Sequence, residues 1–194
     1  FNVFVSQQLV DIVKPKNQNF AVIPCGVDTD LLKPLEKIEC KQKLGWDKNK
    51  RYILFSKGFN VKVKNYPLAK ASVENIPDLE LVEFKGYTRE QVLWLYNACD
   101  LVLMTSFTEG SPQFIKEAMA CNCPIISTDV GDVKMQIEGV DNCFILPYDP
   151  EKIKDHINSI LCNNKRTNGR EKLMALSLNN QSVAHQLIKV YLSI

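Results

Sequence analysis

The run LVLMT at residues 101–105 and the run CPIIS at residues 123–127 carry no charge and show no alternation of apolar and polar side chains. Strands of this kind are typical of a parallel sheet that helices cover on both faces. Similar short runs recur along the chain and are separated by longer segments with helical periodicity. The pattern from residue 51 to residue 161 therefore predicts repeated βαβ units. We expect an α/β fold with a Rossmann-like, doubly wound parallel sheet.

The expected helices and strands follow from the same pattern. One helical segment repeats apolar side chains at spacings of three, four and seven positions, in Val92, Leu95, Tyr96 and Cys99. A similar stripe predicts a last amphipathic helix around residues 183–191. The strands that we expect lie at residues 2–5, 20–23, 51–55, 79–84, 101–105, 124–127 and 143–146.

The charge balance excludes several classes of protein. Lys and Arg number 24 against 22 Asp and Glu, so a protein devoted to coating nucleic acid is not expected. The basic residues between positions 41 and 51 are not interleaved with a set of stacking aromatics, so we expect no nucleic-acid partner. The longest uncharged run, residues 173–188, is shorter than the roughly 20 apolar residues of a membrane-spanning helix.

The chain begins with FNVFVSQQ, which has neither a basic region nor a small-residue cleavage site. This start predicts no signal peptide, and we expect a cytoplasmic protein. Because the chain lacks an initiator Met, we interpret it as part of a longer protein.

The seven cysteines are an odd number, are mostly scattered, and include no CxxC pair. They favour reduced, mostly buried thiols over a disulfide framework or a metal site. His156 and His185 lie in expected outer helices, where a structural role is more common. The motifs GxGxxG, GxxxxGK[ST], HExxH and GxSxG are absent, so dehydrogenase, P-loop, zincin and hydrolase-elbow functions have no support.

The segment after the strand at residues 101–105 carries the strongest signal for chemistry. Ser111 and Pro112 predict a helix start, with Ser111 as the N-cap and Pro112 at the first helical position. The backbone amides of Gln113 and Phe114 would then point out of the helix N-terminus. Together with the helix dipole they predict an anion site suited to phosphate.

Two carboxylates bracket this helix start. Glu109 lies just before the turn, and Glu117 lies eight residues later inside the helix. A carboxylate beside a phosphate site makes sense if it accepts hydrogen bonds from hydroxyl groups that flank the phosphates, as in a nucleotide sugar. The alternative is that Glu109 caps locally and Glu117 is a solvated helix residue, and the spacing alone does not decide between the two.

Three lysines, Lys57, Lys62 and Lys64, follow the strand at residues 51–55. A lysine at this junction can neutralise a diphosphate leaving group, although a solvated loop explains any one of them equally well or better. After the strand at residues 79–84, Gly86 permits a close backbone approach and Tyr87 can flank a base. A simple turn before a helix capped by Thr88 explains the same residues without a ligand.

The segment TSFTEGSPQFIKEAMACNCPIISTDVGD, residues 105–132, resembles the donor-binding core of glycosyltransferase family 4. This is a retaining family with the two-domain GT-B architecture, and its signature is a Glu, seven residues and a second Glu. The segment IPCGVDTDLLKP, residues 23–34, resembles the family's interdomain linker. The resemblance extends from about residue 5 to residue 190.

The resemblance implies roles for individual residues. Glu109 would contact hydroxyls of the transferred sugar, and Glu117 would hold the ribose hydroxyls. Lys64 matches the family's phosphate-binding lysine. The family usually places an Arg six residues earlier, where this chain has Gly58, and the adjacent Lys57 is the candidate replacement. The remaining donor-binding candidates are Gly110, Ser111, Gln113, Phe114, Gly86 and Tyr87.

The resemblance also implies the domain plan. Residues 1–22 would be the tail of an N-terminal domain, 23–34 the linker, 35–172 the nucleotide-sugar donor-binding domain, and 173–194 a helix returning to the N-terminal domain. The intact enzyme would transfer a hexose-type sugar from a nucleoside diphosphate to a glycan, polysaccharide or lipid-linked acceptor. It would need neither a metal nor another cofactor. We expect this chain alone to bind the donor weakly and to transfer nothing, and a lipid-linked acceptor would bring the protein to a membrane surface.

Two other functions fit parts of the sequence. A glycoside hydrolase would use Glu109 and Glu117 as acid and base, but it has no use for a phosphate site. A non-catalytic module would bind a nucleotide or a sugar without transferring it. Titration with uridine and guanosine diphosphates separates a hydrolase, which ignores both, from a transferase.

Overall fold

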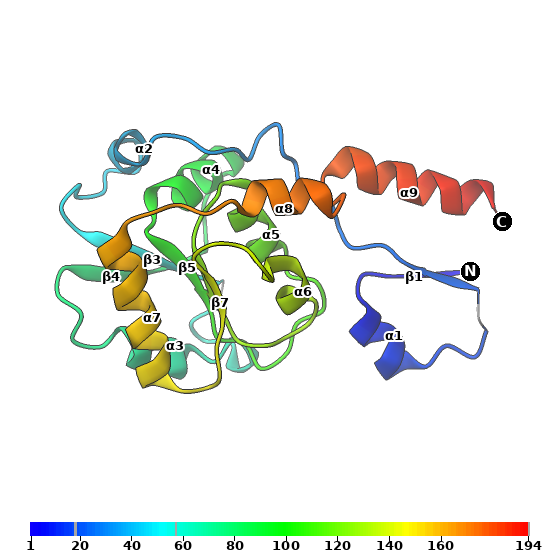
Figure 1. Ribbon diagram of the computed structural model, residues 1–194, viewed down its shortest axis with the longest axis horizontal. Helices are drawn as coiled ribbons and strands as arrows, with labels where there is room; N and C mark the ends of the chain where they lie inside the picture. The colour runs from blue at the N-terminus through cyan, green and yellow to red at the C-terminus, as the bar shows by residue number, and fades with distance from the viewer. Residues whose placement is uncertain (18, 57, 194) are drawn as a thin grey trace.

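The computed structural model describes residues 1–17, 19–56 and 58–193 (Figure 1). Its main sheet has five parallel strands in the order β4-β3-β5-β6-β7. The strands are β3 (Arg51–Phe55), β4 (Leu79–Glu83), β5 (Leu101–Met104), β6 (Ile125–Ser127) and β7 (Cys143–Ile145).

Helices cover both faces of this sheet. Adjacent residues of a strand point to opposite faces, and in this sheet both sets of side chains are buried. Leu54 and Val102 join one buried cluster with residues of α4 (Arg89–Ala98) and α5 (Gln113–Ala120). Ile53, Leu101 and Leu103 join a second cluster with residues of α3 (Tyr66–Val73) and α7 (Pro150–Asn163). The doubly wound arrangement expected from the uniformly apolar runs is therefore confirmed (Figure 1).

The strand order reverses between β3 and β5. The chain proceeds from β3 to β4 on one side, and then returns to place β5 on the other side of β3. In open α/β sheets, ligands bind outside the carboxyl ends of the strands at such a switch point. The segments that follow β3 and β5 are consequently the ones that the fold brings to a binding position.

The expected strands were all found, and their ends shift by one residue at most. The run at residues 51–55 is unchanged, and each of the other six runs loses only its first or last residue, as in β1 (Asn2–Phe4) and β2 (Phe20–Val22). The other described elements are α1 (Gln7–Val13), α2 (Lys37–Lys43), the 3-10 turn η1 (Lys62–Lys64), α6 (Val133–Ile137), α8 (Gly169–Ala175) and α9 (Asn180–Leu192).

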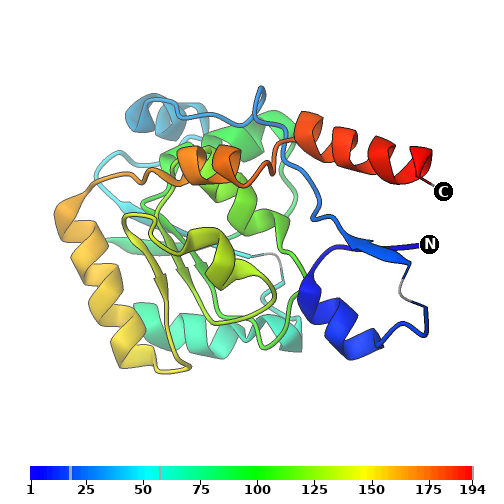
Figure 2. The same cartoon turned by 45° about the vertical axis from the view of Figure 1, so that its right-hand side comes forward.

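Strands β1 and β2 form a separate two-stranded parallel sheet with α1 between them in the chain. Figures 1 and 2 both show this unit and α9 on the same side of the molecule, beside the main sheet. The chain passes from this unit to α2 through residues 23–34, and a parallel bridge joins Val27 to Asn179. Among the helices of the described residues, none is both long enough and apolar enough to cross a membrane.

The linker is also held by an arginine. The Arg170 guanidinium donates hydrogen bonds of 2.7 and 2.8 Å to the carbonyls of Leu32 and Thr29, and one of 3.0 Å to the carbonyl of Ala120 at the end of α5. Gly26 approaches Asn180 so closely that an added Cβ would lie 2.8 Å from its side-chain oxygen. The linker is thus fixed against α5 and the start of α9.

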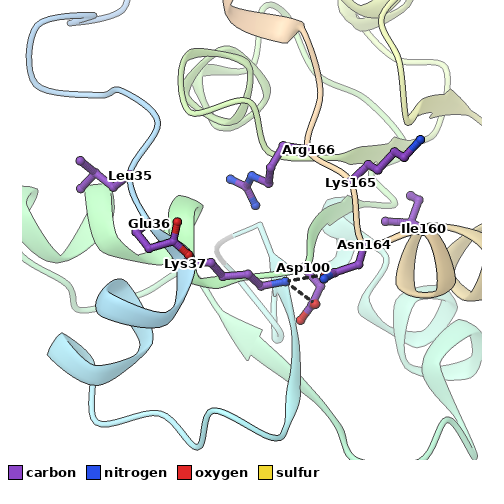
Figure 3. A pocket seen from close by; sticks show the side chains of 8 residues that line it. All are labelled: Leu35, Glu36, Lys37, Asp100, Ile160, Asn164, Lys165 and Arg166. Carbon is purple, nitrogen blue, oxygen red and sulfur yellow. Dashed lines mark hydrogen bonds and ion pairs between the residues drawn. The ribbon is translucent and has the colours of Figure 1, made fainter.

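A cavity of about 230 Å³ opens at the amino-terminal ends of the strands, on the opposite side of the sheet from the carboxyl ends at the switch point (Figure 3). At its centre lies Asp100, whose side chain is 3% exposed and accepts from Lys37 at 2.6 Å, Arg51 at 3.0 Å and the Tyr52 amide at 2.8 Å. Burial alone would raise the pKa of this carboxyl, but the two cations and the hydrogen bonds outweigh it and lower the pKa. Asp100 therefore joins the starts of β3 and β5 to α2.

Candidate active site

The segments after β3 and β5 meet in an ion pair. The Lys64 Nζ lies 2.6 Å from the Glu109 Oε1, and the two side chains are 23% and 15% exposed. The Ser106 hydroxyl donates to the same carboxylate oxygen at 2.7 Å. The switch point of the sheet therefore carries one cation and one carboxylate, both partly open to solvent.

The end of β5 determines where Lys64 lies. The Thr105 hydroxyl lies 3.0 Å from the carbonyls of both Lys64 and Asn65, and the Phe107 amide donates to the Val63 carbonyl at 2.8 Å. These bonds fasten the 3-10 turn η1 to the segment that also carries Glu109. The pairing thus depends on β3 and β5 being neighbours.

The absence of the family arginine at Gly58 has a structural reason. Gly58 has a φ of +114°, and an added Cβ would lie 2.7 Å from the Val61 side chain. The amides of Gly58 and Phe59 both donate to Glu83 Oε1 at 3.0 Å. An arginine would be strained in this conformation. The candidate replacement, Lys57, lies outside the described residues.

The predicted helix start is wrong by one residue. Pro112 itself is the N-cap of α5, with φ −69° and ψ 121°, and the helix begins at Gln113. Ser111 does not cap, because its hydroxyl donates to Asp132 Oδ2 at 2.7 Å. The first amides of a helix have no partner within the helix, so those of Gln113 and Phe114 still form the N-terminal donor set that we expected.

Glu117 is not a solvated helix residue, which was one of the two interpretations of its position. Its Oε2 accepts a hydrogen bond of 3.0 Å from the Tyr96 hydroxyl, which is itself buried. Burial raises the pKa of Glu117, and the Tyr96 hydrogen bond and the charge of Arg89 oppose the rise only in part. The tyrosine belongs to a cluster of rings with Phe84 and Phe114, at centroid distances of 5.5 and 5.9 Å.

A second cavity, of about 190 Å³, adjoins this ring cluster at the end of β4. Gly86 has a φ of +83° and turns the chain there, and Thr88 begins α4 with a capping box completed by Gln91. The turn that precedes the helix also lines the cavity, so the role of Gly86 and Tyr87 toward a base stays a prediction. The lining residues are Phe84, Lys85, Gly86, Tyr87 and Val92.

The turn after β6 borders the same site. Gly131 has a φ of +57°, and a Cβ on it would lie 2.3 Å from the carbonyl oxygen of Gly110 and 3.0 Å from that of Glu109. Its neighbour Asp132 accepts from Ser111, as described above. This turn therefore packs directly on the segment with Glu109.

Three contributors were missed by sequence reasoning. Tyr96 was assigned only to the core face of its helix, Glu83 only to a strand, and Lys116 to no role. The one sequence signal was that Lys116 lies in a segment, residues 114–120, in which five of the seven side chains are apolar. In the described part of the chain, no three His, Cys, Asp or Glu side chains gather where they could hold a metal ion.

Comparison with known proteins identifies the family of this chain. The family model of the group 1 glycosyl transferases matches residues 55–163, which is more than half of the chain. The chain belongs to the group 1 glycosyl transferases. A curated relative, the D-inositol 3-phosphate glycosyltransferase of Mycolicibacterium smegmatis, is 22% identical over 186 residues, and the match covers 80% of this chain and 43% of the relative. The chain therefore spans less than half of that relative's length.

Solved structures of other proteins share the fold. Sucrose-phosphate synthase from Thermosynechococcus elongatus superposes with a TM-score of 0.86 at 20% identity, over 98% of this chain and 57% of the other. Anabaena HepE in complex with UDP-glucose gives a TM-score of 0.76 at 18% identity, over 99% and 63% of the two chains. The expected α/β fold, with the parallel sheet of GT-B glycosyltransferases, is confirmed.

Proposed function

We propose that the protein containing this chain transfers a hexose-type sugar from a nucleoside-diphosphate sugar to an acceptor hydroxyl, with retention of configuration, as a member of glycosyltransferase family 4. The observation that carries the proposal is the pairing of Lys64 with Glu109 beside the N-terminus of α5, at the switch point of the sheet. A sugar-linked pyrophosphate presents anionic oxygens to the cation and sugar hydroxyls to the carboxylate.

The order of groups along the site matches the order of groups in such a donor. The base would occupy the cavity beside Gly86 and Tyr87, and the ribose hydroxyls would reach Glu117 next to the ring cluster. The pyrophosphate would meet the amides of the α5 N-terminus, including Gln113 and Phe114, together with Lys64. Anabaena HepE, which has been solved with UDP and with UDP-glucose, supports a nucleotide sugar as the ligand class.

The chemistry follows from where charge develops. As the glycosidic C–O bond to the diphosphate breaks, the sugar becomes oxocarbenium-like and negative charge grows on the departing phosphate. The ammonium of Lys64 and the helix N-terminus stabilise that charge without having to reorganise, which is the most effective form of electrostatic catalysis. In this proposal neither Glu109 nor Glu117 forms a covalent bond to the sugar, and no metal or other cofactor is required.

The proposal also includes a surface that contacts a further, acceptor-binding domain. The small sheet and α9 lie on the same side of the molecule (Figure 2). Exposed apolar side chains occur near the start of the chain, at Phe1 and Val3, and on α9, at Ile188, Tyr191 and Leu192. We assign residues 1–22 and 173–194 to contacts with a further domain that holds the acceptor glycan or lipid-linked sugar. The chain by itself would then bind donor and transfer nothing.

Calorimetric titration with UDP and GDP tests the donor site directly. The wild-type chain should bind at least one of them, and Lys64→Met should weaken that binding by about tenfold or more, since a charge-assisted hydrogen bond is lost. The matched control is Lys70→Met, which removes an exposed ammonium from α3. Absence of heat with both nucleotides, or equal weakening by both variants, would overturn the assignment.

A further inference from the structure

Lys116 is the one lysine of α5, and its side chain is fully buried, with an exposed fraction of 0%. Its ammonium donates to the Cys25 carbonyl at 2.7 Å and to the Ser111 hydroxyl at 3.1 Å. Burial lowers the pKa of Lys116, and the nearby carboxylate of Asp132 is the largest influence that opposes this. An ammonium in such surroundings needs specific partners, and these partners all belong to segments around the donor site.

Ser111, one of these partners, is part of a chain of hydrogen bonds. The Ser111 hydroxyl accepts from Lys116 and donates to Asp132 Oδ2 at 2.7 Å, so both of its hydrogen-bonding directions are fixed. The other oxygen of Asp132 is buried and has no partner among the described residues. The hydroxyl of the residue that leads into α5 is therefore held between a cation and an anion.

The second partner is the linker. Lys116 reaches the carbonyl of Cys25, and the side chain of Gln113 donates to the next carbonyl, that of Gly26, at 2.8 Å. The first turn of α5 is thus tied at two successive linker carbonyls. The phosphate-facing turn and the linker are joined through side chains of the same helix.

We propose that Lys116 is a positioning residue for the donor. Through Ser111 it holds the turn that opens α5 in the conformation in which its amides converge on the pyrophosphate, and through the Cys25 carbonyl it fastens that turn to the linker. This inference rests on the proposed function, because it assigns Lys116 to the same donor site. Lys116 itself touches neither the sugar nor the phosphates.

A double-mutant cycle tests whether Lys116 acts through Ser111. We expect Lys116→Met to raise the dissociation constant for UDP, or for GDP if that is the nucleotide bound, by about tenfold. In the Ser111→Ala background the same change should cost only about threefold or less, since the link through Ser111 is already broken and only the link to the Cys25 carbonyl is left to lose. In the intact enzyme, the donor KM should rise by a similar factor while kcat at saturating donor stays within about twofold.

Asp132→Asn provides a second route if Lys116→Met does not fold, because it weakens the same chain from outside the helix. It should show the same loss of effect in the Ser111→Ala background, and Lys70→Met should leave binding unchanged in both backgrounds. Equal effects with and without the Ser111 hydroxyl, or a fall in kcat with an unchanged donor KM, would overturn the inference while leaving the proposed function in place. A wild-type chain that binds neither nucleotide overturns the proposed function itself.

Discussion

The role proposed for Lys64 depends on the residues that surround its side chain and its backbone. Lys64 is one of three lysines in a short loop, and the sequence alone favours a solvated role for any of them. Its contact with Glu109, and the support of its backbone by Thr105, distinguish it from Lys62. Because the ion pair is partly exposed, we expect its contribution to stability to be small.

Replacing Lys64 should accordingly affect rate rather than folding. In the intact enzyme, Lys64→Ala should lower kcat by about 10²- to 10³-fold, the typical loss for one preorganised electrostatic donor. The unfolding midpoint should stay close to that of the wild type, as should the rate of the control variant Lys70→Ala. A near-normal rate for Lys64→Ala would refute the role of this lysine.

The raised pKa of Glu117 predicts how its replacement changes stability with pH. A carboxyl whose folded-state pKa lies above its unfolded value favours folding in its protonated form, and this advantage is lost as the pH rises through the folded-state pKa. Denaturant unfolding of Glu117→Gln should therefore show a stability relative to wild type that improves as the pH rises through the raised folded-state pKa of Glu117. A difference that is independent of pH would mean that the burial of this carboxyl has no energetic effect.

Sequence reasoning at the scale of residues could nominate candidates where one segment carried the whole pattern. Glu109, Ser111 and Glu117 lie within nine positions, and their spacing was enough to nominate them. The contact between Lys116 and Cys25 joins residues 91 positions apart, and that between Tyr96 and Glu117 joins residues 21 apart on different helices. Such contacts depend on how elements pack, which no local pattern records.

At the scale of elements, the strands were predictable because their apolar runs are uniform, as in β3 and β5. The start of α5 was not, because two physical preferences compete there. Ser111 is a good N-cap by type, but its hydroxyl is used by Asp132 from a turn 21 positions away. The extended conformation of Pro112 then moves the helix start by one residue.

The turn after β6 is the element whose fit to the site is tightest. Gly131→Ala would place a Cβ 2.3 Å from a backbone oxygen of Gly110 at a φ that favours glycine. We expect a loss of about 1–3 kcal/mol in the free energy of unfolding and weaker binding of the nucleoside diphosphate, because the segment with Glu109 must shift. Gly139→Ala also has a positive φ but meets no atom within 4 Å, so it is the control for backbone strain alone. Equal effects of the two changes would show that the close approach is not important.

At the scale of the whole molecule, the two edges of the sheet have different roles. The carboxyl ends of the strands lie beside the partly exposed pair of Lys64 and Glu109, and the amino ends hold the ion pairs of the buried Asp100 (Figure 3). This division follows from the parallel topology, which brings all strand starts together at one edge and all strand ends together at the other.

The amino edge should therefore contribute to stability and not to binding. Asp100→Asn leaves the cations of Lys37 and Arg51 without a counter-charge, and we expect it to lower the free energy of unfolding by about 2–3 kcal/mol at neutral pH. The loss should shrink as the pH falls through the lowered pKa of Asp100, where the wild-type carboxyl is itself protonated. Unfolding in urea measures the loss, and unchanged nucleotide affinity in the folded variant separates this edge from the donor site.

The account as a whole depends on the turn between β5 and α5 being the place where a pyrophosphate binds. A crystal structure of the chain soaked with UDP tests this most directly. We predict that the diphosphate lies against the amides of Gln113 and Phe114 and within hydrogen-bond distance of Lys64. A diphosphate bound instead in the cavity beside Lys37 and Arg166, at the other edge of the sheet, would contradict the account.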